Sequence, residues 1–91
     1  MSDEITVYWR PACGFCSSLR HQLAQTDLAY TEVNIWDEPD AAATVRAYAG
    51  GNETVPTVVI GRALDADAVG LVNPSVRQVL AAVERRSSGG G

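Results

Sequence analysis

Four short stretches of this chain carry the apolar and β-branched residues that are typical of β-strands. Residues 5–9 and 30–35 alternate between apolar and polar side chains, the pattern of a strand that is buried on one face. Residues 57–60 form a continuous β-branched run, and residues 69–72 form a short apolar stretch. Pro56 stands just before the third stretch, where a strand tolerates proline. The pattern therefore predicts four strands.

Two segments between these strands have the spacing and the end signals of helices. Residues 14–24 place Phe15, Leu19 and Leu23 on one face. A second helix is predicted to begin at Asp37-Glu38-Pro39, with an acidic cap and a proline in its first turn, and to end at Gly50-Gly51.

A last helix follows Asn73-Pro74-Ser75, which we expect to cap it. Its predicted buried face has the spacing i, i+3, i+4, i+7 and consists of Val76, Val79, Leu80 and Val83. We expect this helix to end near Arg86. Residues 87–91 then form a Ser/Gly tail that has nothing to bury and should be flexible.

The predicted element order is βαβαββα, an α/β arrangement with a four-stranded mixed sheet and three helices. The first βαβ unit should have parallel strands, and the last two strands can pair as a hairpin. No internal repeat or second domain is visible, so we expect one domain over residues 1–86.

Length and charge narrow the classes of function. A chain of 91 residues makes one small domain, and a hydrophobic content of 46% is ordinary for a folded protein. The net charge of −4 argues against nucleic acid as the main partner. No apolar run approaches the length of a membrane span, and the acidic start does not resemble a secretory signal. We therefore expect a cytoplasmic protein that binds neither nucleic acid nor membrane.

The two cysteines of the chain, Cys13 and Cys16, have the spacing C-x-x-C between the first strand and the first helix. Strand, C-x-x-C and helix in this order form a thioredoxin-like redox arrangement. Cys13 stands at the start of the helix, where unpaired N–H groups and the positive end of the helix dipole favour the thiolate. Because the thiolate is the nucleophile of disulfide exchange, we predict that Cys13 is the reactive residue and that Cys16 is less exposed.

Other interpretations of the two cysteines remain open at this point. They could be two buried, inert thiols. A structural zinc ion needs about four ligands, and His21 is the only histidine, so we expect no metal site within one chain. An iron–sulfur cluster that two chains share through Cys13 is a further alternative.

Three segments carry a family resemblance. Residues 10–16 read Arg-Pro-Ala-Cys-Gly-Phe-Cys, residues 54–56 read Thr-Val-Pro, and residues 73–75 form the polar cap described above. In this order and spacing they resemble the glutaredoxins of the thioredoxin-like superfamily, which usually have Lys-Pro-Thr/Ser-Cys-Pro-Tyr-Cys in the first segment. The resemblance covers roughly residues 5–85. It implies the thioredoxin-like (glutaredoxin) fold.

Within this family the chain is most similar to the mycoredoxins, which depend on mycothiol. They share the segment Gly-Gly-Asn-x-Thr-Val-Pro-Thr-Val, found here at residues 50–58, and the Asn-Pro-Ser of residues 73–75. The Gly-Gly-x-x-Asp by which glutaredoxins help to hold a carboxylate of glutathione is absent. The loop over residues 61–68 is longer than expected for a mycoredoxin and could alter the edge of the site.

The resemblance also implies how the site is built. The bond between Val55 and Pro56 should be cis, and the Val55 N–H and C=O should face outward to pair with the small thiol. Arg10 should lie at the mouth, where its charge favours the Cys13 thiolate or binds an anionic group of the thiol. The residues implied to contact the small thiol are Arg10, Phe15, Thr54, Val55, Pro56, Asn73, Pro74 and Ser75.

The implied activity is the reduction of mixed disulfides between proteins and a small thiol. Cys13 attacks the sulfur of the small thiol, and Cys16 is not needed for this monothiol route but can form an internal disulfide with Cys13. Mycothiol, or else glutathione, is the expected co-substrate, with no tightly bound cofactor, and a monomer is expected. Two alternatives remain: a general disulfide reductase that depends on thioredoxin reductase, and a module that binds an iron–sulfur cluster or a metal.

Overall fold

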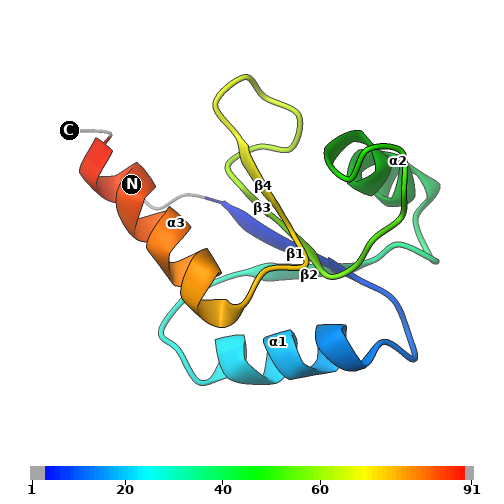
Figure 1. Cartoon of the computed structure of the whole chain (residues 1–91), viewed down its shortest axis with the longest axis horizontal. Helices are drawn as coiled ribbons and strands as arrows, with labels where there is room; N and C mark the ends of the chain where they lie inside the picture. The colour runs from blue at the N-terminus through cyan, green and yellow to red at the C-terminus, as the bar shows by residue number, and fades with distance from the viewer. Residues whose placement is uncertain (1–3, 90–91) are drawn as a thin grey trace.

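The element order in the computed structural model is the βαβαββα order that the sequence predicts (Figure 1). The structure describes residues 4–89, with side chains for residues 4–86. Within that range no helix is both long and apolar enough to cross a membrane. The elements are β1 (Ile5–Trp9), α1 (Gly14–Ala24), β2 (Thr31–Asn34), α2 (Pro39–Tyr48), β3 (Thr57–Ile60), β4 (Val69–Val72) and α3 (Val76–Gly89).

The four strands form one mixed sheet in the order β2-β1-β3-β4. β1 and β2 are parallel, as a βαβ unit requires, while β3 is antiparallel to both β1 and β4. The hairpin register pairs Thr57 with Val72, so the start of β3 and the end of β4 lie together. β3 is an interior strand, paired with β1 on one side and with β4 on the other.

Both faces of the sheet are covered by helices (Figure 1). On one face, side chains of β1 and β3 pack against α1 and α3, as in the contact group that contains Val7, Leu23 and Val79. On the other face, Tyr8 packs in a second group with Val45 of α2. Because both faces are buried, every residue of β3 is buried, which explains its unbroken β-branched sequence.

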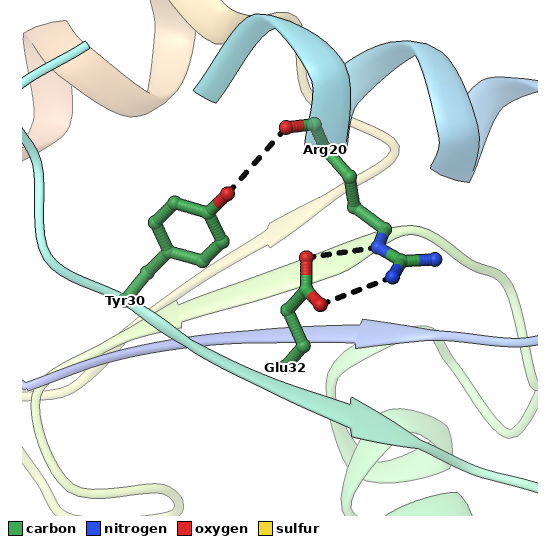
Figure 2. A network of polar contacts seen from close by, with 3 residues as sticks. All are labelled: Arg20, Tyr30 and Glu32. Carbon is green, nitrogen blue, oxygen red and sulfur yellow. Dashed lines mark hydrogen bonds and ion pairs between the residues drawn. The ribbon is translucent and has the colours of Figure 1, made fainter. Parts of the chain in front are cut away.

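A polar network fastens α1 to β2 (Figure 2). The guanidinium group of Arg20 donates two hydrogen bonds to the carboxylate of Glu32, at 2.8 and 3.0 Å, and stacks 4.0 Å from the centroid of the Trp9 ring. The Tyr30 hydroxyl donates to the carbonyl of Arg20 at 3.5 Å. Bidentate pairing and ring stacking hold arginine in a defined orientation. This network helps to fix the position of α1, whose first turn carries the cysteines.

The structure corrects several details of the prediction. Phe15 is 70% exposed, so the buried face of α1 is Cys16, Leu19 and Leu23 rather than the predicted stripe. Leu80 is 38% exposed, and Ala82 is buried in its place beside Val79.

The ends of two helices also differ from expectation. Glu38 occupies the cap position of α2, but its side chain makes no capping hydrogen bond. α3 continues to Gly89, so the first three residues of the predicted flexible tail are helical. The rest of the predicted tail, residues 90 and 91, lies outside the described residues.

Candidate active site

Cys13 is the N-cap residue of α1. Its backbone is extended (φ −115°, ψ 108°), and its Sγ atom accepts a hydrogen bond from the Cys16 backbone N–H at 3.3 Å. In most proteins a hydroxyl or carboxylate oxygen fills this cap position. A sulfur atom that replaces it receives the same N–H bond and the positive end of the helix dipole, both of which favour the thiolate.

The residue before Cys13 turns the chain into the helix. Ala12 has a φ of 60°, in the left-handed region that residues other than glycine rarely adopt. Such a conformation costs about 1–2 kcal/mol. Strained positions of this kind cluster at functional sites, where the surrounding structure holds them.

The cis-proline loop lies against the other side of Cys13. The Val55–Pro56 bond is cis, as the sequence predicts. The Cys13 thiol donates to the carbonyl of Val55 at 3.7 Å, so this carbonyl is directed at the sulfur rather than outward. When Cys13 loses its proton, the thiolate has no hydrogen to donate, and the carbonyl becomes available. The Val55 N–H makes no hydrogen bond within residues 4–89, so it stays available as a donor.

The two thiols have opposite acid–base behaviour. Partial burial raises the pKa of Cys13, but hydrogen bonds from Cys16 and Phe15 and the charge of Arg10 outweigh it, so the pKa is lowered overall. Burial raises the pKa of Cys16 to about 11, helped by its hydrogen bond to Cys13. Cys16 is only 1% exposed. The arrangement therefore provides one accessible thiol that loses its proton more readily than an ordinary cysteine, and one buried thiol that holds its proton more tightly.

Arg10 lies beside the cysteine pair, as predicted. It donates a hydrogen bond to the carbonyl of Pro11 at 3.3 Å, and its guanidinium carbon lies 5.9 Å from the centroid of the Trp36 ring. Arg10 is half-buried and Trp36 is largely exposed, so this cation–π contact lies at the surface of the protein.

The turn before α3 is bonded to the cis-proline loop. Asn73 has a φ of 50°, and its N–H donates to the carbonyl of Pro56 at 2.7 Å. Ser75 forms a capping box with Gln78: the serine hydroxyl accepts the Gln78 N–H at 3.1 Å, and the glutamine side chain accepts the Ser75 N–H at 2.8 Å. The predicted cap is thus confirmed at Ser75. Pro74 is buried between these two residues.

Thr54 has a supporting position. Its carbonyl accepts a hydrogen bond from the buried hydroxyl of Thr57 at 2.8 Å, which ties the cis-proline loop to the first residue of β3. The structure therefore brings the cysteines, the cis-proline loop and the turn before α3 to one end of the molecule.

The loop over residues 61–68 does not lie at the end of the molecule that carries the cysteines. It joins β3 to β4 at the end of the hairpin opposite Pro56 and Asn73 (Figure 1). The Leu64 N–H donates to the Tyr48 hydroxyl at 2.8 Å, which holds the loop against α2. The expectation that this loop could alter the edge of the site is therefore wrong.

Two residues at this end of the molecule belong to none of the sequence motifs. Ser18 and Gln22 line a cavity together with Phe15 and residues 73–75. Their signal in the sequence is the spacing i, i+3, i+7 from Phe15, which places all three on one stripe of a helix.

The described residues contain no complete ligand set for a metal. Over residues 4–89, no group of three or more histidine, cysteine, aspartate or glutamate side chains gathers. A cluster bound by this protein would therefore need ligands from elsewhere, such as a second chain or small thiols.

Comparisons with known proteins agree on one family. The glutaredoxin family model matches residues 5–64. Proteins named as glutaredoxins in two strains of Mycobacterium tuberculosis, CDC 1551 and H37Rv, are each 40% identical to this chain over 81 residues, which is 89% of this chain and 90% of the relative.

Solved structures give the same fold. The thioredoxin-like protein BC3987 superposes with a TM-score of 0.62 at 23% identity, covering 86% of this chain and 97% of that one. Oxidised mitochondrial thioredoxin 3 of Saccharomyces cerevisiae has a TM-score of 0.64 at 15% identity, with 91% and 77% covered. Glutaredoxin C1 of a poplar hybrid, in its holo form, has a TM-score of 0.54 at 24% identity, with 89% and 74% covered.

Proposed function

The chain belongs to the glutaredoxin family of thiol–disulfide oxidoreductases, and we propose that it reduces mixed disulfides between proteins and mycothiol. One observation carries the assignment of the nucleophile. The Sγ atom of Cys13 caps α1, accepts the Cys16 N–H at 3.3 Å and has a lowered pKa, whereas Cys16 is buried and protonated. Only Cys13 combines access with thiolate character, the two conditions for disulfide exchange.

The proposed cycle has two exchange steps. The Cys13 thiolate attacks the small-thiol sulfur of the mixed disulfide, which forms a Cys13–small thiol disulfide and releases the substrate protein as a thiolate. A second small-thiol thiolate then attacks the small-thiol sulfur on Cys13. This step releases the symmetric small-thiol disulfide and restores the Cys13 thiolate, so that each step breaks one S–S bond and forms one.

The neighbouring residues support this cycle. The unpaired Val55 N–H and the carbonyl freed by deprotonation of Cys13 are a donor and an acceptor for the backbone amide of the small thiol. Arg10 favours the thiolate of Cys13. Phe15, being 70% exposed, offers an apolar surface beside the reacting sulfur.

The choice of mycothiol rests on the resemblance of residues 50–58 and 73–75 to the mycoredoxins. Further parts of the proposal are a cytoplasmic location, where small thiols are kept reduced, a monomeric state and no tightly bound cofactor. Light scattering after size-exclusion chromatography tests the monomer.

A coupled assay of NADPH oxidation tests the electron source. One mixed-disulfide protein is offered with three reducing systems: mycothiol and its reductase, glutathione and its reductase, and thioredoxin reductase alone. Turnover only with mycothiol supports the proposal. Turnover only with thioredoxin reductase contradicts it and favours a dithiol cycle in which Cys16 is obligatory. Visible absorption of anaerobically purified protein would favour the cluster-binding alternative.

A further inference from the structure

An open cavity of about 330 Å³ lies between the outer face of α1 and the turn before α3, which begins beside α1 (Figure 1). Its lining comes from Phe15, Ser18, Leu19 and Gln22 on one side and from residues 73–75 on the other. We refer to it as the α1–α3 cavity. Two of its residues, Ser18 and Gln22, belong to no motif of the sequence.

The α1–α3 cavity begins within the first turn of α1, close along the helix to the reactive cysteine, although Cys13 itself does not line it. Phe15 lies two residues after Cys13, and the cavity follows α1 from there to Gln22, a span of about 10 Å at 1.5 Å per residue. The opposite wall is bonded to the cis-proline loop, because the Asn73 N–H donates to the carbonyl of Pro56. A molecule whose sulfur is bonded to Cys13 can therefore extend into this cavity.

The lining combines apolar side chains with neutral polar ones and contains no ionisable side chain. Ser18, Gln22 and Asn73 offer a hydroxyl and two amides, and none of these side chains has a hydrogen-bond partner within residues 4–89. Such groups pair with hydroxyls as donors and as acceptors. A carboxylate in the same place would meet no cationic side chain to compensate its desolvation. The exposed ring of Phe15 adds an apolar wall against which the C–H face of a sugar ring can pack.

The N-terminus of α3 does not turn the cavity into a site for a carboxylate. A helix N-terminus attracts anions through its unpaired N–H groups. Here the capping box uses the N–H groups of Ser75 and Gln78, so two of the usual anion donors are already bonded. The cavity therefore suits a neutral group that is rich in hydroxyls better than a carboxylate.

We propose that the α1–α3 cavity binds the uncharged, polyhydroxylated part of the small thiol whose sulfur is bonded to Cys13. Ser18 and Gln22 then determine specificity, because they bond the sugar hydroxyls and favour a sugar thiol over glutathione, which has carboxylates at both ends. This inference rests on the proposed function and deepens it, since it names the part of the site that recognises the thiol.

The test uses one peptide that carries mycothiol, glutathione or N-acetylcysteine amide through a disulfide. The measured quantity is the second-order rate at which the reduced protein releases the peptide thiol. In Ser18→Ala/Gln22→Ala, the rate with the mycothiol adduct should fall about tenfold, as expected for the loss of two ordinary hydrogen bonds. The rate with the N-acetylcysteine amide adduct, which has no sugar, should not change. A matched control, Ser17→Ala/Gln25→Ala, removes the same residue types from α1 and its C-cap position, outside the cavity, and should leave every rate unchanged.

A second readout does not depend on turnover. In Cys16→Ser, Cys13 is converted to its mycothiol mixed disulfide by exchange with mycothiol disulfide, which releases one mycothiol. The side-chain amide resonances of Gln22 should then shift in NMR spectra, and they should not shift in the mixed disulfide with N-acetylcysteine amide.

The outcomes separate the two proposals. Equal loss of rate with all three adducts, or no loss with the mycothiol adduct, overturns the role of the cavity while the reductase function stands. Unshifted Gln22 resonances in the mycothiol mixed disulfide also overturn the role of the cavity while the reductase function stands. Wild-type protein that releases peptide thiol from none of the adducts contradicts the proposed function and, with it, this inference.

Discussion

The backbone N–H of Cys16 donates a hydrogen bond to the Sγ atom of Cys13 across 3.3 Å, so the first turn of α1 is capped by its own nucleophile. The same turn buries Cys16, whose pKa is raised to about 11. One helical turn thus shifts the pKa values of its two cysteines in opposite directions. The proposed role of Cys13 as the nucleophile depends on this asymmetry.

The asymmetry predicts selective alkylation by iodoacetamide. Because the pKa of Cys13 is below its ordinary value of 9.0, its rate should reach half of its maximum below pH 9 and fall as the pH drops through that pKa. Cys16 should stay unmodified in the folded protein at neutral pH, since it is buried and protonated. Peptide mapping by mass spectrometry identifies the modified residue. In urea both cysteines should react alike. Preferential modification of Cys16 in the folded state would be incompatible with the assignment.

Replacing Arg10 should raise the pKa of Cys13. The guanidinium charge is one of the causes that lower this pKa, after the hydrogen bonds from Cys16. In Arg10→Ala the alkylation profile of Cys13 should move to higher pH, and the rate at pH 7 should fall a few-fold, because partly exposed charges interact weakly through water. Arg10→Lys keeps the charge and should retain most of the rate. An unchanged profile in Arg10→Ala would remove Arg10 from the account of thiolate stabilisation.

The network of Figure 2 should contribute measurably to stability. Arg20→Ala removes a bidentate ion pair with Glu32 and the stacking on Trp9, and should lower the free energy of unfolding by about 1–2 kcal/mol. An isolated exposed ion pair would give about 0–1 kcal/mol. Urea unfolding measures the difference. Arg77→Ala is the control, because Arg77 is exposed and has no hydrogen bond or ion pair in the described part of the chain. If Arg20→Ala and Arg77→Ala lowered the free energy of unfolding equally, the network would contribute nothing to stability.

Gly70 should not tolerate a side chain. A Cβ atom there would overlap the ring of Tyr48, which packs across β4 from α2. Gly70→Ala should therefore lose about 1–3 kcal/mol of stability by overpacking, which calorimetry would show as a lower Tm. Adding Tyr48→Ala should make the loss smaller than the sum of the single variants. Gly14→Ala, where nothing lies within 4 Å of the added atom, should keep or raise the Tm. A stable Gly70→Ala would contradict the close approach.

The strands and α1 could be predicted because their residue patterns reflect burial: β3 is buried on both faces and has an unbroken β-branched run, and α1 buries residues at helical spacing. The last helix shows the limit of this reasoning. The pattern favoured Leu80 for the core, but α3 buries the smaller Ala82 and leaves Leu80 partly exposed. Close packing of a helix on a sheet selects small side chains, which a search for large apolar residues overlooks.

The reactive part of the site was visible in the sequence because its chemistry is local. Cys13 and Cys16 belong to one helical turn, and their spacing alone places one at the cap and the other beneath it. The α1–α3 cavity could not be found in this way. Ser18 and Gln22 meet residues 73–75 only because α1 and α3 pack on the same face of the sheet, far apart in sequence.

The most direct test of the account is which cysteine receives the small thiol. The reduced Cys16→Ser and Cys13→Ser variants are each mixed with a peptide that carries mycothiol through a disulfide, and the mass of each protein is measured after one turnover. The account predicts that Cys16→Ser releases the peptide thiol and gains the mass of one mycothiol on Cys13, while Cys13→Ser does neither. If Cys13→Ser releases the peptide thiol at the wild-type rate, or if Cys16→Ser is inactive, Cys13 is not the independent nucleophile that the geometry of α1 indicates.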